Sequence, residues 1–184
     1  MLDHLVVAAR TLEEGAAWVA DRLGVATVPG GKHPLMGTHN RLLSLGGRAY
    51  LEVIAIDPEA SDPGRPRWYA LDSPAMRSRL ARGPALIHWV ESVEDIEAAL
   101  GEYPARVEVL AVSRGDLRWK IGVPADGSLP CDGVCPTLIE WESGHPSERL
   151  PPSGCELFAF GAAPSLEARI SLPGGAKATL SAGE

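Results

Sequence analysis

Four polar residues that could bind a metal ion lie inside otherwise apolar segments. His4 lies in Leu-Asp-His-Leu-Val, Glu52 in Tyr-Leu-Glu-Val-Ile, His88 in Leu-Ile-His-Trp-Val and Glu140 in Leu-Ile-Glu-Trp-Glu. Burying such groups without a partner is costly, so their presence in apolar strands needs a reason. Two imidazoles and two carboxylates form a ligand set for a borderline divalent cation. The sequence therefore predicts a metal site made by these four residues.

The spacing of the four residues supports the set, because each half of the chain has a His followed about 50 residues later by a Glu. Taken alone, each His would more often be a hydrogen-bonded core residue, and each Glu a paired strand carboxylate. Side chains alternate between the two faces of a strand. We therefore expect His88 and Glu140 to face a cavity while Trp89 and Trp141 pack against helices. Glu142 shares a face with Glu140 and could replace it.

The same order of elements is expected in both halves of the chain. The first half predicts a strand, a helix that Thr11 caps and Gly24 ends, and three strands, over residues 2–9, 12–23, 25–28, 38–45 and 50–56. A glycine-rich loop is expected from Gly30 to Pro34. The second half predicts a strand, a helix that Ser92 caps, and three strands, over residues 85–91, 93–100, 106–113, 117–123 and 137–142.

These elements predict the α+β fold class, with tandem βαβββ modules that form cupped mixed sheets around a shared cavity. The modules cover residues 1–57 and 85–142 of a single domain spanning residues 1–184. Residues 58–84 are rich in proline and predict a linker with one short helix. Residues 143–184 predict a C-terminal β extension that lengthens a sheet or covers an edge.

Composition excludes several classes of function. Lys and Arg number 17 against 24 Asp and Glu, a formal net charge of -7, and no basic run is present for nucleic acid. No apolar run approaches the roughly 20 residues that span a membrane, and no signal peptide is visible. The odd number of cysteines, Cys131, Cys135 and Cys155, favours a reducing cytoplasm over a disulfide framework. Cys131 and Cys135 lack a second ligand pair for zinc. We expect a cytoplasmic protein with a small-molecule partner.

The duplicated unit with His4, Glu52, His88 and Glu140 resembles the vicinal oxygen chelate superfamily, which includes glyoxalase I, extradiol dioxygenases, epimerases and antibiotic-resistance proteins. Pro-Gly-Gly-Lys-His-Pro-Leu-Met-Gly-Thr-His-Asn at residues 29–40, followed by Tyr-Leu-Glu-Val-Ile-Ala from residue 50, is similar to the glyoxalase-like domain group. The resemblance covers about residues 1–142. It implies paired βαβββ modules and an open coordination site facing a small oxygenated substrate, and it does not imply a particular reaction.

The stretch from residue 30 to residue 41 contains candidate substrate-binding groups. Its three glycines give a flexible backbone. His33, Asn40 and Arg41 could contact a substrate at the rim of the cavity, and His39 could act there as an acid or a base. An ordinary loop with turn-forming residues explains the same pattern equally well.

These observations lead to the hypothesis of a metal-dependent lyase or isomerase of glyoxalase type. A divalent ion (Zn, Ni, Mn or Fe) would polarise the carbonyl of a small α-oxygenated substrate and hold the enediolate formed when a proton leaves the next carbon. Glu140, or Glu52 by the pseudo-symmetry, would be the catalytic base, with His39 as the weaker candidate.

Two other functions use the same residues. An extradiol-type dioxygenase with non-haem iron would use His4, His88 and one Glu, although the fourth carboxylate would fill a position that oxygen needs. A metal-free binding or sequestering protein would hold an apolar or aromatic ligand near tryptophans such as Trp119. Paired modules can close a site within one chain or by exchange between two chains, so a homodimer is compatible with either function.

Overall fold

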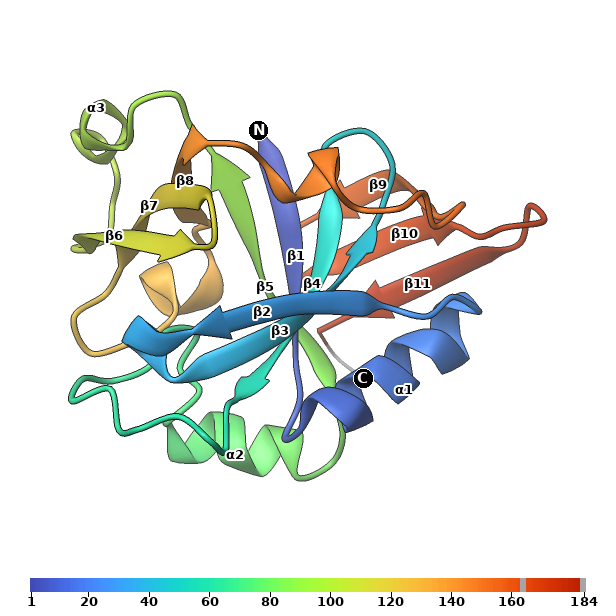
Figure 1. The fold of residues 1–184 in the computed structure, drawn as a ribbon, viewed down its shortest axis with the longest axis horizontal. Coiled ribbons are helices and arrows are strands. Elements are labelled where there is room, and N and C mark those ends of the chain that lie inside the picture. Colours follow the sequence, from blue (N-terminus) through green and yellow to red (C-terminus); the bar gives the residue numbers. More distant parts are fainter. Residues whose placement is uncertain (163–164, 183–184) are drawn as a thin grey trace.

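Two units with the same order of elements form most of the computed structural model, which describes residues 1–162 and 165–182 (Figure 1). The first unit comprises β1 (Leu2–Ala8), α1 (Leu12–Leu23), β2 (Val28–His33), a 3-10 turn (Pro34–Met36), β3 (Thr38–Ser44) and β4 (Tyr50–Ile56). The second comprises β5 (Ala85–Ser92), α3 (Ile96–Leu100), β6 (Glu108–Arg114), β7 (Leu117–Val123), a 3-10 turn (Pro130–Gly133) and β8 (Thr137–Ser143). The predicted α+β fold class with paired βαβββ units is confirmed.

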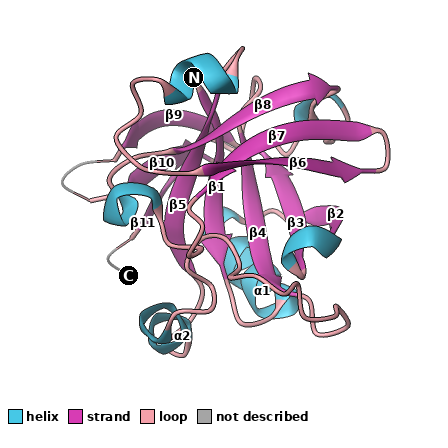
Figure 2. Cartoon of the chain, turned by 90° about the vertical axis from the view of Figure 1, so that its left-hand side faces the viewer, coloured by secondary structure: helices cyan, strands magenta, loops and turns pink. Residues whose placement is uncertain are grey.

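The strands of both units form one curled sheet of eight strands, in the order β2-β3-β4-β1-β5-β8-β7-β6 (Figure 2). β1 pairs with β4 in parallel and β5 pairs with β8 in parallel, and the remaining neighbours are antiparallel. The first strands of the two units, β1 and β5, are adjacent at the centre of the sheet. One continuous sheet therefore carries residues from both units on its concave face.

The helix boundaries follow from local capping. Thr11 accepts a hydrogen bond from the Glu14 N–H at 3.2 Å, and Gly24 ends α1 with a φ of 68°. In the second unit Asp95 caps α3, whereas we expected Ser92. Ser92 continues β5 instead, because its N–H donates to the Met1 carbonyl at 2.8 Å.

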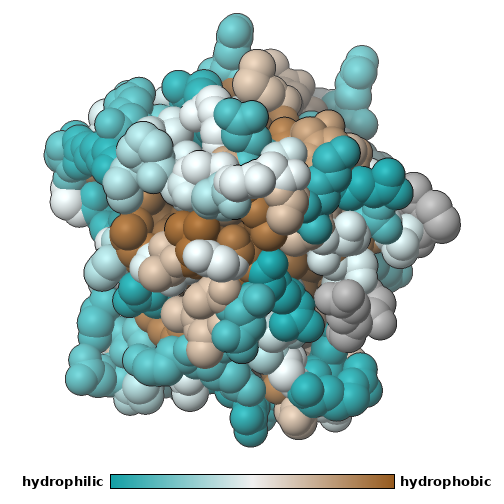
Figure 3. Space-filling model, turned by 90° about the vertical axis from the view of Figure 1, so that its right-hand side faces the viewer, coloured by the Kyte–Doolittle hydropathy of each residue, from teal (hydrophilic) through white to brown (hydrophobic). Residues whose placement is uncertain are grey.

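The C-terminal extension covers one face of the large sheet, whereas we expected it to lengthen a sheet or cover an edge. After a 3-10 turn (Pro146–Glu148), the strands β9 (Glu156–Gly161), β10 (Glu167–Ser171) and β11 (Lys177–Ser181) form a separate antiparallel sheet. Its buried residues Ala168, Ile170 and Leu180 pack in one cluster with residues of α1, β1 and β4. The face that carries the loops of this sheet shows a band of apolar side chains (Figure 3). Residues 163–164 and 183–184 of the predicted extension lie outside the described residues.

The segment between the units does more than connect them. It contains α2 (Pro74–Leu80), capped by Ser73, and it buries Trp68, Tyr69 and Leu71 in the apolar cluster on the concave side. Tyr69 and Ala70 have φ values of 57° and 55°, and the Ala70 N–H donates to the Gly127 carbonyl at 2.7 Å. A residue without glycine's freedom adopts this conformation only when its surroundings enforce it. The segment therefore closes one end of the concave face.

The cysteines differ from the expectation that all three are reduced. Cys131 and Cys135 form a disulfide in the loop before β8, and Cys155 is free and buried. The count of three cysteines did not indicate this bond, because a count does not show which cysteines pair. The bond joins two cysteines only four residues apart, and the third stays free. In the part of the chain that the structure describes, no helix has the length and apolar character needed to cross a membrane.

The buried face of the C-terminal sheet predicts a large effect on stability. Ile170 is completely buried, so Ile170→Ala leaves a cavity and we expect it to lower the free energy of unfolding by about 3 kcal/mol. Phe158 belongs to the same sheet and is 48% exposed, so Phe158→Ala is the control and should change it by less than about 1 kcal/mol. Denaturant titration measures both. Equal effects would show that this sheet does not pack on the large one.

Candidate active site

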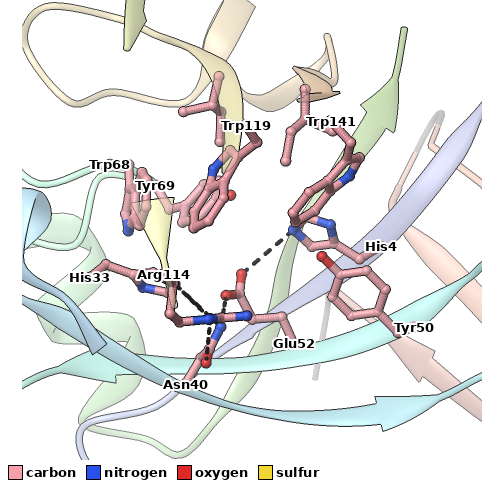
Figure 4. A pocket seen from close by; sticks show the side chains of 12 residues that line it. His4, His33, Asn40, Tyr50, Glu52, Trp68, Tyr69, Arg114, Trp119 and Trp141 are labelled. Carbon is pink, nitrogen blue, oxygen red and sulfur yellow. Dashed lines mark hydrogen bonds and ion pairs between the residues drawn. The ribbon is translucent and has the colours of Figure 1, made fainter. Parts of the chain in front are cut away.

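A pocket on the concave face lies where the two units meet (Figure 4). The space between its lining side chains is about 340 Å³, open solvent at its mouth included. The pocket is lined by His4, His33, Asn40, Tyr50, Glu52, Trp68, Tyr69, Arg114, Trp119, Ile121, Ile139 and Trp141. Residues from both units and from the connecting segment therefore form one site.

An ion pair between His4 and Glu52 lies in this pocket. His4 Nε2 is 3.6 Å from Glu52 Oε2, and both side chains are less than a tenth exposed. The parallel register of β1 and β4 explains their proximity, because it sets His4 opposite Tyr50, two residues from Glu52 and on the same face. The imidazole also stacks on the Tyr50 ring, with centroids 4.6 Å apart. Asn40 holds the other oxygen of Glu52 by donating to Oε1 at 2.6 Å.

Asp3 positions His4 from the side opposite Glu52. The Asp3 carboxylate accepts hydrogen bonds from His4 Nδ1 at 2.7 Å and from Trp141 Nε1 at 2.9 Å. A third bond comes from His145 Nε2 at 3.1 Å, and since His145 Nδ1 accepts from the Ser147 N–H, it is Nε2 that carries the proton. A register shift in β1 between residues 2 and 4 allows Asp3 and His4 to point to the same side.

These contacts fix the charges at neutral pH. Burial alone would lower the pKa of His4, but the interactions with Asp3 and Glu52 outweigh it and raise this pKa to about 9. Burial would raise the pKa of Glu52, and the interactions with His4, His33 and Asn40 lower it to about 2 instead. The pKa of Asp3 is also lowered, because the bonds from His145 and His4 outweigh burial. His4 is therefore an imidazolium between two carboxylates.

His33 and Arg114 form the opposite wall of the pocket. Burial lowers the pKa of His33 to about 4, so this imidazole is neutral, and its Nδ1 lies 3.1 Å from Thr38 Oγ1. Arg114 Nη1 donates to His33 Nε2 at 3.1 Å and to Asn40 Oδ1 at 3.2 Å. Arg114 is the last residue of β6, so the second unit supplies a cation to the polar groups of the first.

Gly30 and Gly31 lie in β2, whereas we expected a flexible loop. A Cβ atom on Gly30 would lie 2.0 Å from Asn40 Oδ1, and one on Gly31 would lie 2.5 Å from Arg114 Cδ. The Gly31 N–H also donates to Asn40 Oδ1 at 2.8 Å. The two glycines therefore serve close packing around two pocket side chains, and neither has a positive φ.

His88 and Glu140 do not reach the pocket. His88 is completely buried, and its Nε2 accepts from the Thr137 N–H at 3.1 Å. Glu140 accepts from the Ile96 N–H at 2.8 Å, at the start of α3, and from Lys120 Nζ at 3.1 Å. Trp141 lines the pocket, so the faces of β8 are the reverse of those we expected from alternation.

Strand register gives the physical reason for this difference. In the first unit, Glu52 on β4 pairs with Val6 on β1. The equivalent residue on β5 is Val90, which pairs with Thr137 on β8. The second unit thus has a hydroxyl at the position equivalent to Glu52, and Glu140 lies three residues further along. Similar spacing in sequence did not mean equivalent positions in the sheet.

Two other predicted site residues also lie outside the pocket. Arg41 donates to Thr27 through its side chain at 2.8 Å, and His39 Nδ1 is 4.0 Å from Asp57 Oδ1. Sequence reasoning missed Asp3, although an acidic residue beside His4 in an apolar strand was a usable signal. It also missed Arg114. This residue gave no signal in the sequence, because it packs against Gly31 of the other unit and the two are far apart along the chain.

The residues present do not fit the predicted four-ligand metal site. Of the four predicted ligands, only His4 and Glu52 line the pocket. The proton on His4 Nε2 is directed at Glu52. In residues 1–162 and 165–182, no group of three or more His, Cys, Asp and Glu is arranged to hold a metal ion. The donor set is instead that of an imidazolium and a carboxylate.

The chain is similar to one protein family and to several solved structures. A family model described as a glyoxalase-like domain matches residues 2–170. A crystal structure of a hypothetical protein from Staphylococcus aureus aligns with a TM-score of 0.52 and 16% identity, over 93% of this chain and 80% of that one. Methylmalonyl-CoA epimerase from Mycobacterium tuberculosis aligns with a TM-score of 0.49 and 21% identity, over 80% of this chain and 90% of that one. No curated protein matches the chain in sequence.

The raised pKa of His4 predicts a pH dependence of stability. The imidazolium stabilises the folded state fully below pH 6.5, and the stabilisation is lost as the pH rises through about 9. The loss amounts to at most about 3 kcal/mol. Chemical denaturation at several pH values measures it, and His4→Gln should give a flatter profile over this interval. An unchanged slope in the variant would contradict the assignment.

The broken ligand set predicts weak metal binding. We expect protein purified without chelator to contain much less than one equivalent of zinc, nickel, manganese or iron. The second unit supplies no ligand, because Thr137 lies at the position equivalent to Glu52 and Glu140 binds the start of α3. Elemental analysis measures this content. About one equivalent, lost in both His4→Ala and His88→Ala, would restore the metal site predicted from the sequence.

Proposed function

The chain belongs to the glyoxalase-like domain family, and on this premise we propose that it is a lyase or isomerase that moves a proton beside the carbonyl group of a small oxygenated compound. The observation that carries the proposal is the buried pair of His4 and Glu52 in the wall of the pocket. It combines a proton acceptor with a cationic hydrogen-bond donor, the two groups that enolisation requires.

Glu52 is the proposed base, in place of Glu140. Asn40 fixes one oxygen, which leaves Oε2 as the atom that accepts the proton. The 3.6 Å separation from His4 Nε2 is longer than a hydrogen bond, so the pair is loose. A substrate oxygen that accepts the His4 proton would separate the pair and raise the pKa of Glu52, which makes the carboxylate a better base in the complex than in the free enzyme.

His4 is the proposed electrophile. Its imidazolium would donate to the carbonyl oxygen and stabilise the negative charge that develops as the carbon loses its proton. Tyr50 and Tyr69 can assist, because burial raises the pKa of both phenols and keeps them protonated. Neither hydroxyl bonds to another residue within the described part of the chain, so both can donate to a substrate.

Asp3 and His145 are positioning residues in this mechanism. Asp3 binds the far nitrogen of His4 and so fixes the orientation of the ring. It also favours the protonated imidazole, which is the form that can donate to an oxygen. His145 in turn orients Asp3 from the C-terminal extension.

The metal ion and the dioxygenase chemistry expected from the sequence are not part of this mechanism. Both need His88 in the pocket, and that imidazole bonds to Thr137 instead. The electrophile that a metal would supply is here a protonated side chain.

A second candidate function is supported by the aromatic lining of the pocket. Trp68, Trp119 and Trp141 all line it, which suits the sequestering of an aromatic or apolar ligand without reaction. Such a protein would show ligand-induced changes in tryptophan fluorescence and no turnover.

We further propose a cytoplasmic homodimer as the working form. The free and buried thiol of Cys155 supports the location, and the duplicated architecture supports pairing. A Cys131–Cys135 disulfide that persists in the cell would instead favour an oxidising compartment, so its redox state there decides the location. Light scattering measures the mass in solution, and thiol titration of protein isolated under acid quench measures the redox state in the cell.

The proposal predicts hydrogen exchange at carbon. Small hydroxycarbonyl compounds such as hydroxyacetone, and 2-oxo acids such as pyruvate, are incubated with enzyme in deuterated water and examined by NMR. Glu52→Gln should lower the exchange rate by about 100-fold or more, because the base is lost. Glu140→Gln should leave it unchanged, since that carboxylate binds α3 and Lys120. The reverse result would return the base to Glu140, and no exchange with any compound would favour sequestering.

A further inference from the structure

Arg114 is a cation in the pocket wall without a carboxylate partner. Its Nη1 donates to two neutral groups, His33 Nε2 and Asn40 Oδ1. Among the residues that the structure describes, no carboxylate lies within ion-pair distance of it, and its Nε and Nη2 have no hydrogen-bond partner. Arg65, Arg67 and Arg149, by contrast, each pair with an Asp or Glu. A guanidinium held in a pocket with free donors is suited to binding an anion.

The chain builds a defined place for this side chain. Gly31 makes room, because a Cβ atom there would overlap Arg114 Cδ. The guanidinium lies 5.9 Å from the centre of the Trp119 ring, within reach of a cation–π contact. His33 is neutral and therefore accepts a hydrogen bond from the guanidinium. Three separate features thus converge on Arg114, and Figure 4 shows it across the pocket from His4.

The distance from Arg114 to the proposed base limits the size of the ligand. A single amide, that of Asn40, lies between them: its Oδ1 is 3.2 Å from Arg114 Nη1 and its Nδ2 is 2.6 Å from Glu52 Oε1. An anion bound to the free donors of Arg114 would therefore place its neighbouring carbon close to Glu52. The oxygen on that carbon would then lie near His4.

The charges of the pocket groups sum to zero before a ligand binds. His4 is cationic between two carboxylates, so this trio has a net charge of -1, and Arg114 balances it while His33 is neutral. A planar carboxylate matches the fork of a guanidinium in two parallel hydrogen bonds, which a carbonyl or hydroxyl cannot form.

From these observations we propose that Arg114 binds the carboxylate of the substrate, which is a small 2-oxo or 2-hydroxy acid. This substrate class rests on the proposed function: Glu52 would remove the C2 proton of a 2-hydroxy acid, or the C3 proton of a 2-oxo acid, whose C2 is the carbonyl carbon and has no hydrogen. Arg114 then determines specificity, and His4 with Glu52 performs the proton transfer.

The test uses lactate as probe and lactamide as its neutral counterpart, titrated into the full chain by calorimetry. Arg114→Gln removes the charge, Arg114→Lys keeps the charge without the fork, and Gly31→Ala displaces the side chain. Arg118→Gln is the matched control, because Arg118 is exposed on the adjacent strand β7. Circular dichroism confirms that each variant is folded.

We expect the native chain to bind lactate at least tenfold more tightly than lactamide. Arg114→Gln should abolish this preference with lactamide binding unchanged, and Gly31→Ala should weaken it. Arg114→Lys should retain part of it, and Arg118→Gln all of it. No preference in the native chain, or an undiminished one in Arg114→Gln, would overturn the proposal. Inorganic phosphate binding more tightly than lactate would also overturn it, in favour of a phosphorylated substrate.

The Glu52→Gln variant separates this inference from the proposed function. It should keep the preference for lactate, because Arg114 is intact, while hydrogen exchange is lost. Exchange of pyruvate by an Arg114→Gln enzyme with an unchanged KM would refute the carboxylate site alone. Carboxylate binding that depends on Arg114, with no exchange in the native chain, would refute the proton transfer alone.

Discussion

The buried carboxylate of Asp3 is the contact on which the site depends. It accepts three hydrogen bonds, from His4 in β1, Trp141 in β8 and His145 in the segment before β9. Removing it would leave His4 Nδ1, Trp141 Nε1 and His145 Nε2 without their acceptor, which is more costly than losing one surface contact because both histidines are buried. One carboxylate therefore holds together the first unit, the second unit and the C-terminal extension, and at the same time sets the charge of the pocket.

Much of the fold could be predicted because its determinants are local. The cap at Thr11, the stop at Gly24 and the apolar runs of β1, β4 and β7 each act within a few residues. The pairing of His4 with Glu52 was also accessible, since both interrupt apolar strands. What failed was the transfer of this logic to β8, because the register between two parallel strands depends on contacts that no short segment contains.

The other errors share a cause, which is contact between units. Gly30 and Gly31 were expected in a flexible loop, and their role is visible only when Asn40 and Arg114 are placed against them. The connecting segment has the composition of a linker, yet Tyr69 is buried in the pocket wall. Proline and polar residues describe the local chain well and say nothing of the few aromatic residues among them that a distant surface buries.

The substitution of Thr137 at the position equivalent to Glu52 has a stereochemical consequence. Of two equivalent carboxylates on opposite walls, one could take a proton from the substrate carbon and the other could return a proton to the opposite face of the planar enediolate, which is what inversion of a carbon centre requires. With a carboxylate on one wall alone, the proposed chemistry is confined to a single prochiral face. The loss of internal symmetry in the protein is thus a source of handedness in its product.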